Sequence, residues 1–512
     1  MNPALRRLEP VTVAALVASA GALQTLAFVH TWAWPLPLLA LAWWVARLDA
    51  APPRRAALLA WCYGTAWLSA GVWWLFISMH QYGGLPAPLA AAAVLALSAA
   101  LSLVLAAAGA AYARWRSGTG LDAALFAALW LLAELARGLI FTGFPWVAAG
   151  YSQVDSPLAA LAPWLGVYGV GAVMAALAVA VVRLVQSRGR QWLAAAVSVA
   201  LVGAAVALPR DFTQPAGEIS VALLQSNVLQ DEKFAAERMP ETLAWVAHEL
   251  MASTADLVVA PETAVPLLPF QLKDFAPGYW EMLVEHFSAP RRAALLGVPL
   301  GDFERGYTNS VVGLSATPGY RYDKHHLVPF GEFIPTGFRW FTEMMNIPLG
   351  DFARGVPVPP SFAVAGQRVG PNICYEDLFG EELALRFADA ATAPTLLANV
   401  SNMGWFGDSS AIAQHLNISR VRSLELQRPM IRATNTGATA IIDHQGVVTA
   451  MLAPQTRGVL QGRVQGRQGV TPFAAWAARW GLWPLVLGAV GVVVALAVWR
   501  CRSRPTGSAA LR

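Results

Sequence analysis

The chain has 512 residues, of which 56% are hydrophobic and only 13% are charged. This composition excludes an ordinary soluble protein, in which about a quarter of the residues are charged. The formal net charge of +5 is too small for this length to indicate nucleic-acid binding. Twenty-one tryptophans are typical of a chain that lies at membrane–water interfaces. We therefore expect a membrane protein, long enough for more than one domain.

Apolar runs fill residues 1–209 and return near the C-terminus. Because a span needs about 20 apolar residues, we predict a bundle of seven transmembrane helices in 1–209. An eighth is predicted in 471–500, followed by a cytoplasmic tail, 501–512. The expected spans are 11–29, 34–46, 56–79, 86–111, 121–141, 158–182, 192–208 and 472–499.

The arginines predict the orientation of these spans. Short cytoplasmic segments of membrane proteins are enriched in Lys and Arg. With the N-terminus inside, every short cytoplasmic segment carries arginine, whereas outer loops such as 30–32 and 81–85 carry none. Both termini are then cytoplasmic, and residues 210–470 form an extracytoplasmic domain.

The segment 210–470 alternates β-rich runs with helical stretches, which predicts an α/β layered domain. Gly, Pro, Asn or Asp stands at many of the strand ends. The expected strands are 219–225, 256–260, 293–298, 310–314, 369–374, 395–399 and 439–443. The expected helices are 239–252, 279–287 and 409–427.

Two charged residues stand where chemistry is expected. Glu262 follows the apolar run 257–260, and α/β sheets present ligand-facing groups at the carboxyl ends of their strands. The alternative is that Glu262 caps the next turn. Lys324 opens a Lys-His-His segment that leads to Pro-Phe-Gly-Glu, ending at Glu332. The alternatives here are a solvated surface lysine and a turn carboxylate.

Cys374 is the one thiol expected outside the cytoplasm, since Cys62 lies in a span and Cys501 in the tail. An unpaired thiol in an oxidising compartment is a hazard unless it is buried or used. Cys374 is therefore either a small buried hydrophobe or a nucleophile. Its place at a strand-to-turn junction favours the nucleophile. The cysteine spacing indicates no zinc site.

The chemistry of the three residues is complementary. A thiol attacks as a thiolate, and a carboxylate can take its proton. Attack on an ester or amide carbonyl creates an oxyanion, which a lysine ammonium and a backbone N–H would stabilise. The sequence has no Gly-x-Ser-x-Gly motif for a serine mechanism.

With Glu262, Lys324 and Cys374 in this order, the sequence resembles the nitrilase superfamily. With its spans it is similar to the membrane branch, the apolipoprotein N-acyltransferases. The resemblance covers nearly the whole chain, and its further motifs lie at 144–146, 150–153, 399–402, 405–408, 414–415 and 432–437. Two positions depart from the family pattern. The stretch 225–234 has Val228-Leu229 where the family often has Ile-Pro, and it ends with Lys233-Phe234 where the family often has tryptophan; Met403 stands where the family often has aspartate.

The resemblance implies a nitrilase-like αββα sandwich and no metal or organic cofactor. It implies Cys374 as nucleophile, Glu262 as base and Lys324 in oxyanion stabilisation. Supporting residues would be Glu332, Tyr375 and Glu376, and substrate contacts would come from Trp405, Phe144, Trp146 and Arg137. For Arg137 the open alternatives are a lipid phosphate and a structural pair with Glu134, because both residues lie within a span.

The implied reaction moves an acyl chain from a membrane phospholipid, phosphatidylethanolamine, to Cys374 and then to the N-terminal α-amine of a diacylated apolipoprotein. The implied location is the bacterial inner membrane, with a periplasmic catalytic domain. Two rival interpretations are a membrane-tethered nitrilase-type amidase and a receptor or scaffold without turnover. The large bundle argues against a simple tether, and the intact catalytic set argues against a scaffold.

Overall fold

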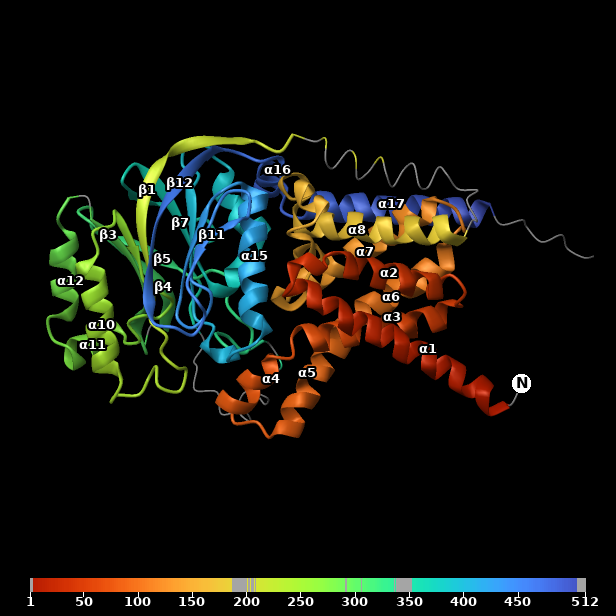
Figure 1. Cartoon of the computed structure of the whole chain (residues 1–512), viewed down its shortest axis with the longest axis horizontal. Helices are drawn as coiled ribbons and strands as arrows, with labels where there is room; N and C mark the ends of the chain where they lie inside the picture. The colour runs from red at the N-terminus through yellow and green to blue at the C-terminus, as the bar shows by residue number, and fades with distance from the viewer. Residues whose placement is uncertain are drawn as a thin grey trace, which may run out of the picture. The chain divides into compact units, whose positions relative to one another are not determined.

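The computed structural model describes residues 3–186, 209–290, 292–304, 306–335 and 352–503, with single positions 200, 203, 207 and 337. These residues belong to two compact units (Figure 1). The helical unit comprises Met1–Trp73, Ala91–Pro209 and Leu482–Arg512, and the α/β unit comprises Trp74–Ala90 and Arg210–Gly481. Almost all of the expected span 192–208 and of the tail 501–512 lies outside the described residues.

The helical unit is built from apolar helices. Its main helices are α1 (Pro3–Leu23), α2 (Pro35–Leu48), α3 (Pro53–Gly71), α5 (Ala87–Leu101, its first turn in the other unit), α6 (Leu103–Trp115), α7 (Leu121–Leu139), α8 (Ala162–Gln186) and α17 (Trp483–Arg502). Within the described residues, five segments are long and apolar enough to cross a membrane: Val11–Phe28, Ala87–Trp115, Leu121–Thr142, Pro157–Gln186 and Trp483–Arg502. They correspond to five of the eight expected spans. The second expected span is a helix of 14 residues, shorter than the roughly 20 that a span needs.

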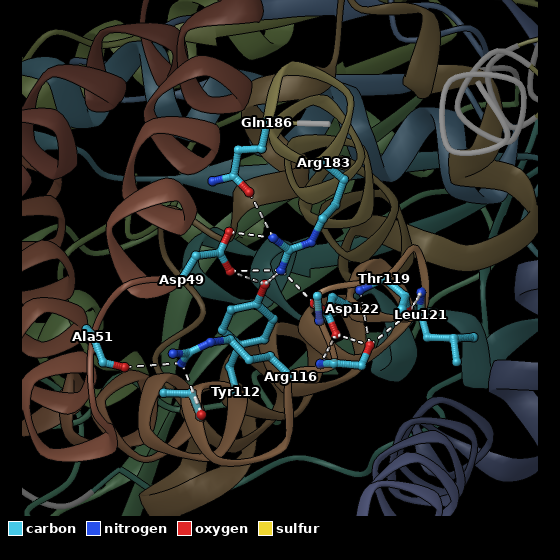
Figure 2. Close-up of polar contacts among 12 residues, drawn as sticks. Asp49, Ala51, Tyr112, Arg116, Thr119, Leu121, Asp122, Arg183 and Gln186 are labelled. Carbon is cyan, nitrogen blue, oxygen red and sulfur yellow. Dashed lines mark hydrogen bonds and ion pairs between the residues drawn. The ribbon is translucent and has the colours of Figure 1, made fainter. Parts of the chain in front are cut away.

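A buried charge cluster joins the ends of four helices of this unit (Figure 2). The guanidinium of Arg183, on α8, donates to both carboxylate oxygens of Asp49 after α2, at 2.7 and 2.8 Å. It also donates to Asp122 on α7 at 2.6 Å and to the hydroxyl of Tyr112 on α6 at 3.0 Å. Because Arg183 is only 6% exposed, these partners replace its water shell. The cluster therefore fixes α2, α6, α7 and α8 to one another.

The α/β unit contains two six-stranded sheets, ordered β12-β1-β2-β3-β4-β5 and β11-β10-β9-β8-β7-β6. The central pairs β1–β2, β2–β3, β7–β8 and β8–β9 are parallel. The strands of the first sheet are β1 (Thr213–Gln225), β2 (Leu257–Val259), β3 (Ala293–Asp302), β4 (Gly306–Leu314), β5 (Tyr320–Asp323) and β12 (Gly458–Gly469). Those of the second are β6 (Phe362–Val364), β7 (Gln367–Ile373), β8 (Leu396–Ser401), β9 (Met430–Thr434), β10 (Ala440–Ile442) and β11 (Val448–Met451).

Side chains alternate between the two faces of each sheet. On β1, Val221 and Leu223 enter the core between the sheets, whereas Ala222 and Leu224 face the helices on the outside. The first sheet is covered by α10 (Met239–Ala252), α11 (Pro269–Phe275) and α12 (Tyr279–Phe287). The second is covered by α14 (Gly380–Ala384), α15 (Ser410–Leu426) and α16 (Pro472–Trp480). Figure 1 shows these four layers, so the expected αββα sandwich is confirmed.

The expected span 472–499 is not one helix. It is divided at Gly481, whose φ of 55° interrupts the helix between α16 and α17. Phe473, Ala474 and Ala477 of α16 are buried against helices of the α/β unit. The α/β unit therefore extends to Gly481, beyond the expected boundary at residue 470.

The segment Trp74–Ala90 also differs from the expectation, which placed its first residues in a span. Its aromatic side chains pack within the α/β unit instead. The indole N–H of Trp74 donates to Gln414 Oε1 at 3.0 Å, and its ring lies 4.4 Å from that of Phe406. The ring of Tyr82 lies 5.7 Å from that of Trp405. These tertiary contacts outweigh the apolar pattern that extended the span past Gly71.

Candidate active site

Three strand ends bring the expected catalytic residues together. Glu262 comes after β2, Lys324 directly after β5, and Cys374 directly after β7. The Lys324 ammonium lies 3.7 Å from the Glu262 carboxylate and is almost fully buried. The Cys374 thiol is close enough for both charges to act on it. Carboxylate, ammonium and thiol thus share one site.

Glu332 holds the lysine in place. Lys324 Nζ donates to Glu332 Oε1 at 2.9 Å. The side-chain amide of Asn309, on β4, donates to Glu262 at 2.7 Å and to Glu332 at 2.8 Å. The backbone N–H of Val328 donates to the second oxygen of Glu332 at 2.9 Å. Each of these bonds is made to a charged group, the stronger kind of hydrogen bond.

The second oxygen of Glu262 accepts a bond from the backbone N–H of Asn402 at 2.8 Å. The side chain of Asn402 is itself fixed, because it donates to Gln230 at 2.8 Å and accepts from Asn435 at 2.9 Å. The main-chain carbonyl of Glu262 accepts from the ammonium of Lys233 at 3.0 Å. The carboxylate that could serve as a base therefore has a defined orientation.

Cys374 sits on a sharp turn with a φ of 51°, in the left-handed region that non-glycine residues rarely adopt. Its carbonyl is held by Asn399 Nδ2 at 3.4 Å and by His415 Nε2 at 3.2 Å. Arg432 lies 3.0 Å from His415 Nδ1. Because a guanidinium only donates, Nδ1 accepts, and the ring proton is on Nε2, facing the Cys374 carbonyl.

Glu376 connects the chain segments that carry Lys324 and Cys374. One carboxylate oxygen accepts from the Tyr322 hydroxyl at 2.5 Å and from the backbone N–H of Ile373 at 2.7 Å. The other accepts from the backbone N–H groups of the two histidines after Lys324, at 2.8 and 3.2 Å. The neighbouring Tyr375 is buried, with its ring packed against other aromatic rings.

Burial and charge set the protonation states of the site. Burial, and secondarily Glu262, raises the pKa of the Cys374 thiol well above its usual value, although Lys324 lowers it. Burial alone would lower the pKa of Lys324, but Glu332 and Glu262 more than compensate, so its pKa is raised. At neutral pH the thiol is therefore protonated and Lys324 is charged. Attack by Cys374 then requires a base, and Glu262 is beside it.

The other expected site residues are divided between the two units. Trp405 belongs to the α/β unit, in the turn Gly404–Phe406, and is half-buried. Phe144, Trp146 and Arg137 belong to the helical unit. The Arg137 guanidinium donates to the carbonyls of Phe144 and Trp146 at 3.1 and 2.5 Å and lies 3.5 Å from Glu134. These contacts favour the structural alternative for Arg137.

The sequence analysis gave no role to several residues of this network. Asn309, Asn402 and Arg432 are the main ones. Each is a buried polar residue, within a strand for Asn309 and Arg432 and directly after one for Asn402, and a polar residue in an otherwise apolar strand run is the signal that could have identified them. Lys233 was noted only as part of a departure from the family pattern, although a lysine is rarely buried.

Both parts of the chain are similar to known protein families. Residues 20–180 match the family model of the apolipoprotein N-acyltransferase N-terminal domain, and residues 220–472 match that of the carbon-nitrogen hydrolases. Proteins named apolipoprotein N-acyltransferase are among the relatives. The one from Verminephrobacter eiseniae is 54% identical over 84% of this chain and 84% of its own length. The relative from Ralstonia nicotianae is 47% identical over 96% of this chain and 94% of its own length. The relative from Bordetella bronchiseptica is 42% identical over 95% of this chain and 97% of its own length. The chain therefore belongs to the apolipoprotein N-acyltransferase family.

Proposed function

We propose that this protein transfers an acyl chain from a membrane phospholipid to the N-terminal α-amine of a diacylglyceryl-cysteine on apolipoproteins. One observation carries the proposal: the buried carboxylate of Glu262, the buried ammonium of Lys324 and the partly buried thiol of Cys374 converge in one site. The same chain also has helices long and apolar enough to cross a membrane. The family resemblance to proteins named for this transfer supports it. Phosphatidylethanolamine is the proposed donor.

In the first half-reaction Glu262 takes the proton from the Cys374 sulfur. The thiolate attacks the ester carbonyl carbon of the phospholipid, and a C–S bond forms. Lys324 stabilises the oxyanion by its charge. When the intermediate collapses, the C–O bond breaks and the proton on Glu262 moves to the leaving oxygen, which departs as a lysophospholipid.

In the second half-reaction the free amine of the acceptor attacks the thioester on Cys374. A C–N bond forms, the C–S bond breaks, and Glu262 carries a proton from nitrogen to sulfur, which restores the thiol. Water must be excluded between the two steps, because hydrolysis of the thioester would make the enzyme a phospholipase. Sequential use of one nucleophile makes the kinetics ping-pong.

The surrounding residues are proposed to act through position or contact. Glu332 and Glu376 hold the segments that carry the catalytic set, with Tyr375 packed beside them. Trp405 and Phe144 are partly exposed aromatic residues and are proposed contacts for acyl chains. Trp146 and Arg137 are buried and are proposed to shape the loop that carries Phe144.

We further propose that the protein lies in the bacterial inner membrane with both termini in the cytoplasm. This orientation is supported by arginines in the short cytoplasmic segments, such as Arg54 and Arg55 before the third span and Arg114 and Arg116 after the fourth. The domain 210–470, which extends to Gly481 in the structure, would then be periplasmic. This location fits the proposed function, because the apolipoprotein acceptors are exported across the membrane.

The test is intact-mass analysis of the purified wild type and of Cys374→Ala after incubation with phosphatidylethanolamine. The expected result is one added acyl chain on the wild type alone, discharged by a diacylated lipopeptide. Discharge by water at the same rate would favour an amidase-like hydrolase. No adduct under any lipid condition would overturn Cys374 as nucleophile.

A further inference from the structure

Lysine is scarce in this protein. Among 36 Lys and Arg residues the sequence contains three lysines, Lys233, Lys273 and Lys324. Lys273 is exposed on α11, whereas Lys233 and Lys324 are buried in the active-site region. Two of the three lysines thus lie in the active-site region, whereas nearly all other basic residues of the chain are arginines. Unlike arginine, a buried lysine can lose its proton within the physiological pH range.

The chain around Lys233 is anchored to the same network as the catalytic residues. It follows β1, and the backbone of Val228 exchanges two hydrogen bonds with the side chain of Asn435, at 2.9 and 2.7 Å. Gln230 accepts a bond from Asn402 at 2.8 Å. Asn402 in turn donates to the Glu262 carboxylate. Lys233 is therefore held at a fixed position beside Glu262.

The Lys233 ammonium has few partners. Within the described residues, its one hydrogen bond is to the main-chain carbonyl of Glu262, at 3.0 Å, although an ammonium has three donors. The negative groups that act on it are the Glu262 carboxylate and the Cys374 sulfur. Burial lowers the pKa of Lys233 to about 8, although these two groups raise it.

Lys233 balances the charges of Glu262, Glu332, Lys324 and Cys374. The nearby guanidinium of Arg432, which also acts on Cys374, is paired with Asp377 at 3.4 Å and adds no net charge. At rest, Glu262 and Glu332 contribute two negative charges, Lys324 one positive charge and the Cys374 thiol none. Transfer of the thiol proton to Glu262 leaves this sum unchanged, as does attack, which moves the charge from sulfur to oxygen. Without Lys233 these four groups would carry a net charge of minus one when the oxyanion forms, which is costly at low dielectric.

We propose that Lys233 is a second active-site cation, a positioning residue that acts through Glu262 and keeps the net charge of the site at zero during acyl transfer. The inference rests on the proposed function. The other charged groups around it are Lys324, which lies 3.7 Å from Glu262, and Glu332, which binds Lys324. On its own segment, Asp231 is exposed and Glu232 is half-buried.

The experiment measures the rate at which the full-length protein forms the Cys374 acyl adduct, for the wild type, Lys233→Met, Lys233→Arg and the exposed control Lys273→Met. Lys233→Met is expected to slow adduct formation on the order of 10- to 100-fold without lowering the unfolding temperature, since it removes a buried charge. The control is expected to match the wild type. Equal rates in wild type and Lys233→Met, or a loss that parallels a loss of stability, would overturn the proposal.

The pH profile tests the charge itself. Wild-type adduct formation is expected to decline as the pH rises through about 8, because Lys233 then loses its proton. Lys233→Arg stays charged, so its profile is expected to lack this decline. Identical profiles would overturn the proposal even if Lys233→Met did not fold.

Alkylation of Cys374 by iodoacetamide, located by peptide mass, separates this inference from the proposed function because it needs no lipid. It is expected to be slower in Lys233→Met than in the control, because the thiolate has lost a nearby cation. A wild type that forms no acyl adduct would refute the proposed function. A wild type that forms the adduct while Lys233→Met is alkylated at an unchanged rate would refute the inference alone.

Discussion

Replacing Arg183 by methionine is expected to lower the free energy of unfolding of the helical unit by about 3–5 kcal/mol. The lost hydrogen bonds alone would account for less, since those between membrane helices average about 0.6 kcal/mol each. The larger loss comes from the buried carboxylate of Asp122 and the partly buried carboxylate of Asp49. They lie 2.6 and 2.7 Å from the guanidinium and would be left without this cation. The methionine fills most of the volume, so the cavity contribution is small.

The assay is unfolding in detergent micelles, followed by tryptophan fluorescence, with Arg116→Met as control. Arg116 is also an arginine of this region, but its guanidinium donates to the main-chain carbonyls of Ala51 and Ala113, at 3.1 and 3.0 Å. Its loss is expected to cost about 1 kcal/mol. Adding Asp122→Asn to Arg183→Met is expected to restore part of the stability, because one orphaned charge disappears. If Arg183→Met cost no more than the control, or if the double variant were less stable than the single one, the reasoning would be refuted.

Three further predictions concern other polar contacts. Glu332→Gln is expected to slow adduct formation on Cys374 by about 100-fold, since Lys324 loses its 2.9 Å partner; an unchanged rate by intact mass would contradict this. Burial, then Arg432, keeps the pKa of His415 well below its usual value, so the unfolded state binds more protons below about pH 6.5 and stability should fall as the pH drops there. His415→Gln should flatten that decline in unfolding temperature against pH. Arg137→Ala is expected to cost about 1.5–3 kcal/mol of stability, measured by thermal unfolding; loss of lysophospholipid release in protein that remains folded would restore the lipid-phosphate interpretation.

The sequence was sufficient to predict the layered architecture. The alternation of β-rich runs with helical stretches predicted an α/β layered domain, and the family resemblance predicted the αββα sandwich. In the structure, β1 has one apolar face toward the other sheet and one toward the helices. The positions of Glu262 and Cys374 at the ends of the expected strands 256–260 and 369–374 were predictable, because α/β sheets present functional groups at the carboxyl ends of strands. The strand β5, after which Lys324 lies, was not among the expected strands.

The partners of these residues could not be predicted from the sequence. Asn309 and Glu332 bind each other only because β4 and the turn after β5 meet in the folded chain, and spacing carries no signal of that contact. The division at Gly481 was missed because an apolar run of sufficient length outweighs one glycine in a hydropathy argument. Arg137 was ambiguous because a buried guanidinium binds carbonyls or phosphate with the same donors.

The segment Trp74–Ala90 has a consequence for how the protein is made. The α/β unit is continuous in space but not along the chain, because this segment precedes the rest of the unit by several helices. A fragment starting at Arg210 would lack the side chains that pack on Trp405, Phe406 and Gln414, and would expose these residues to water. During synthesis, the N-terminal helices emerge first. The catalytic unit can therefore fold completely only when residues 210–481 pack against the segment Trp74–Ala90, which is synthesised earlier, between two apolar helices.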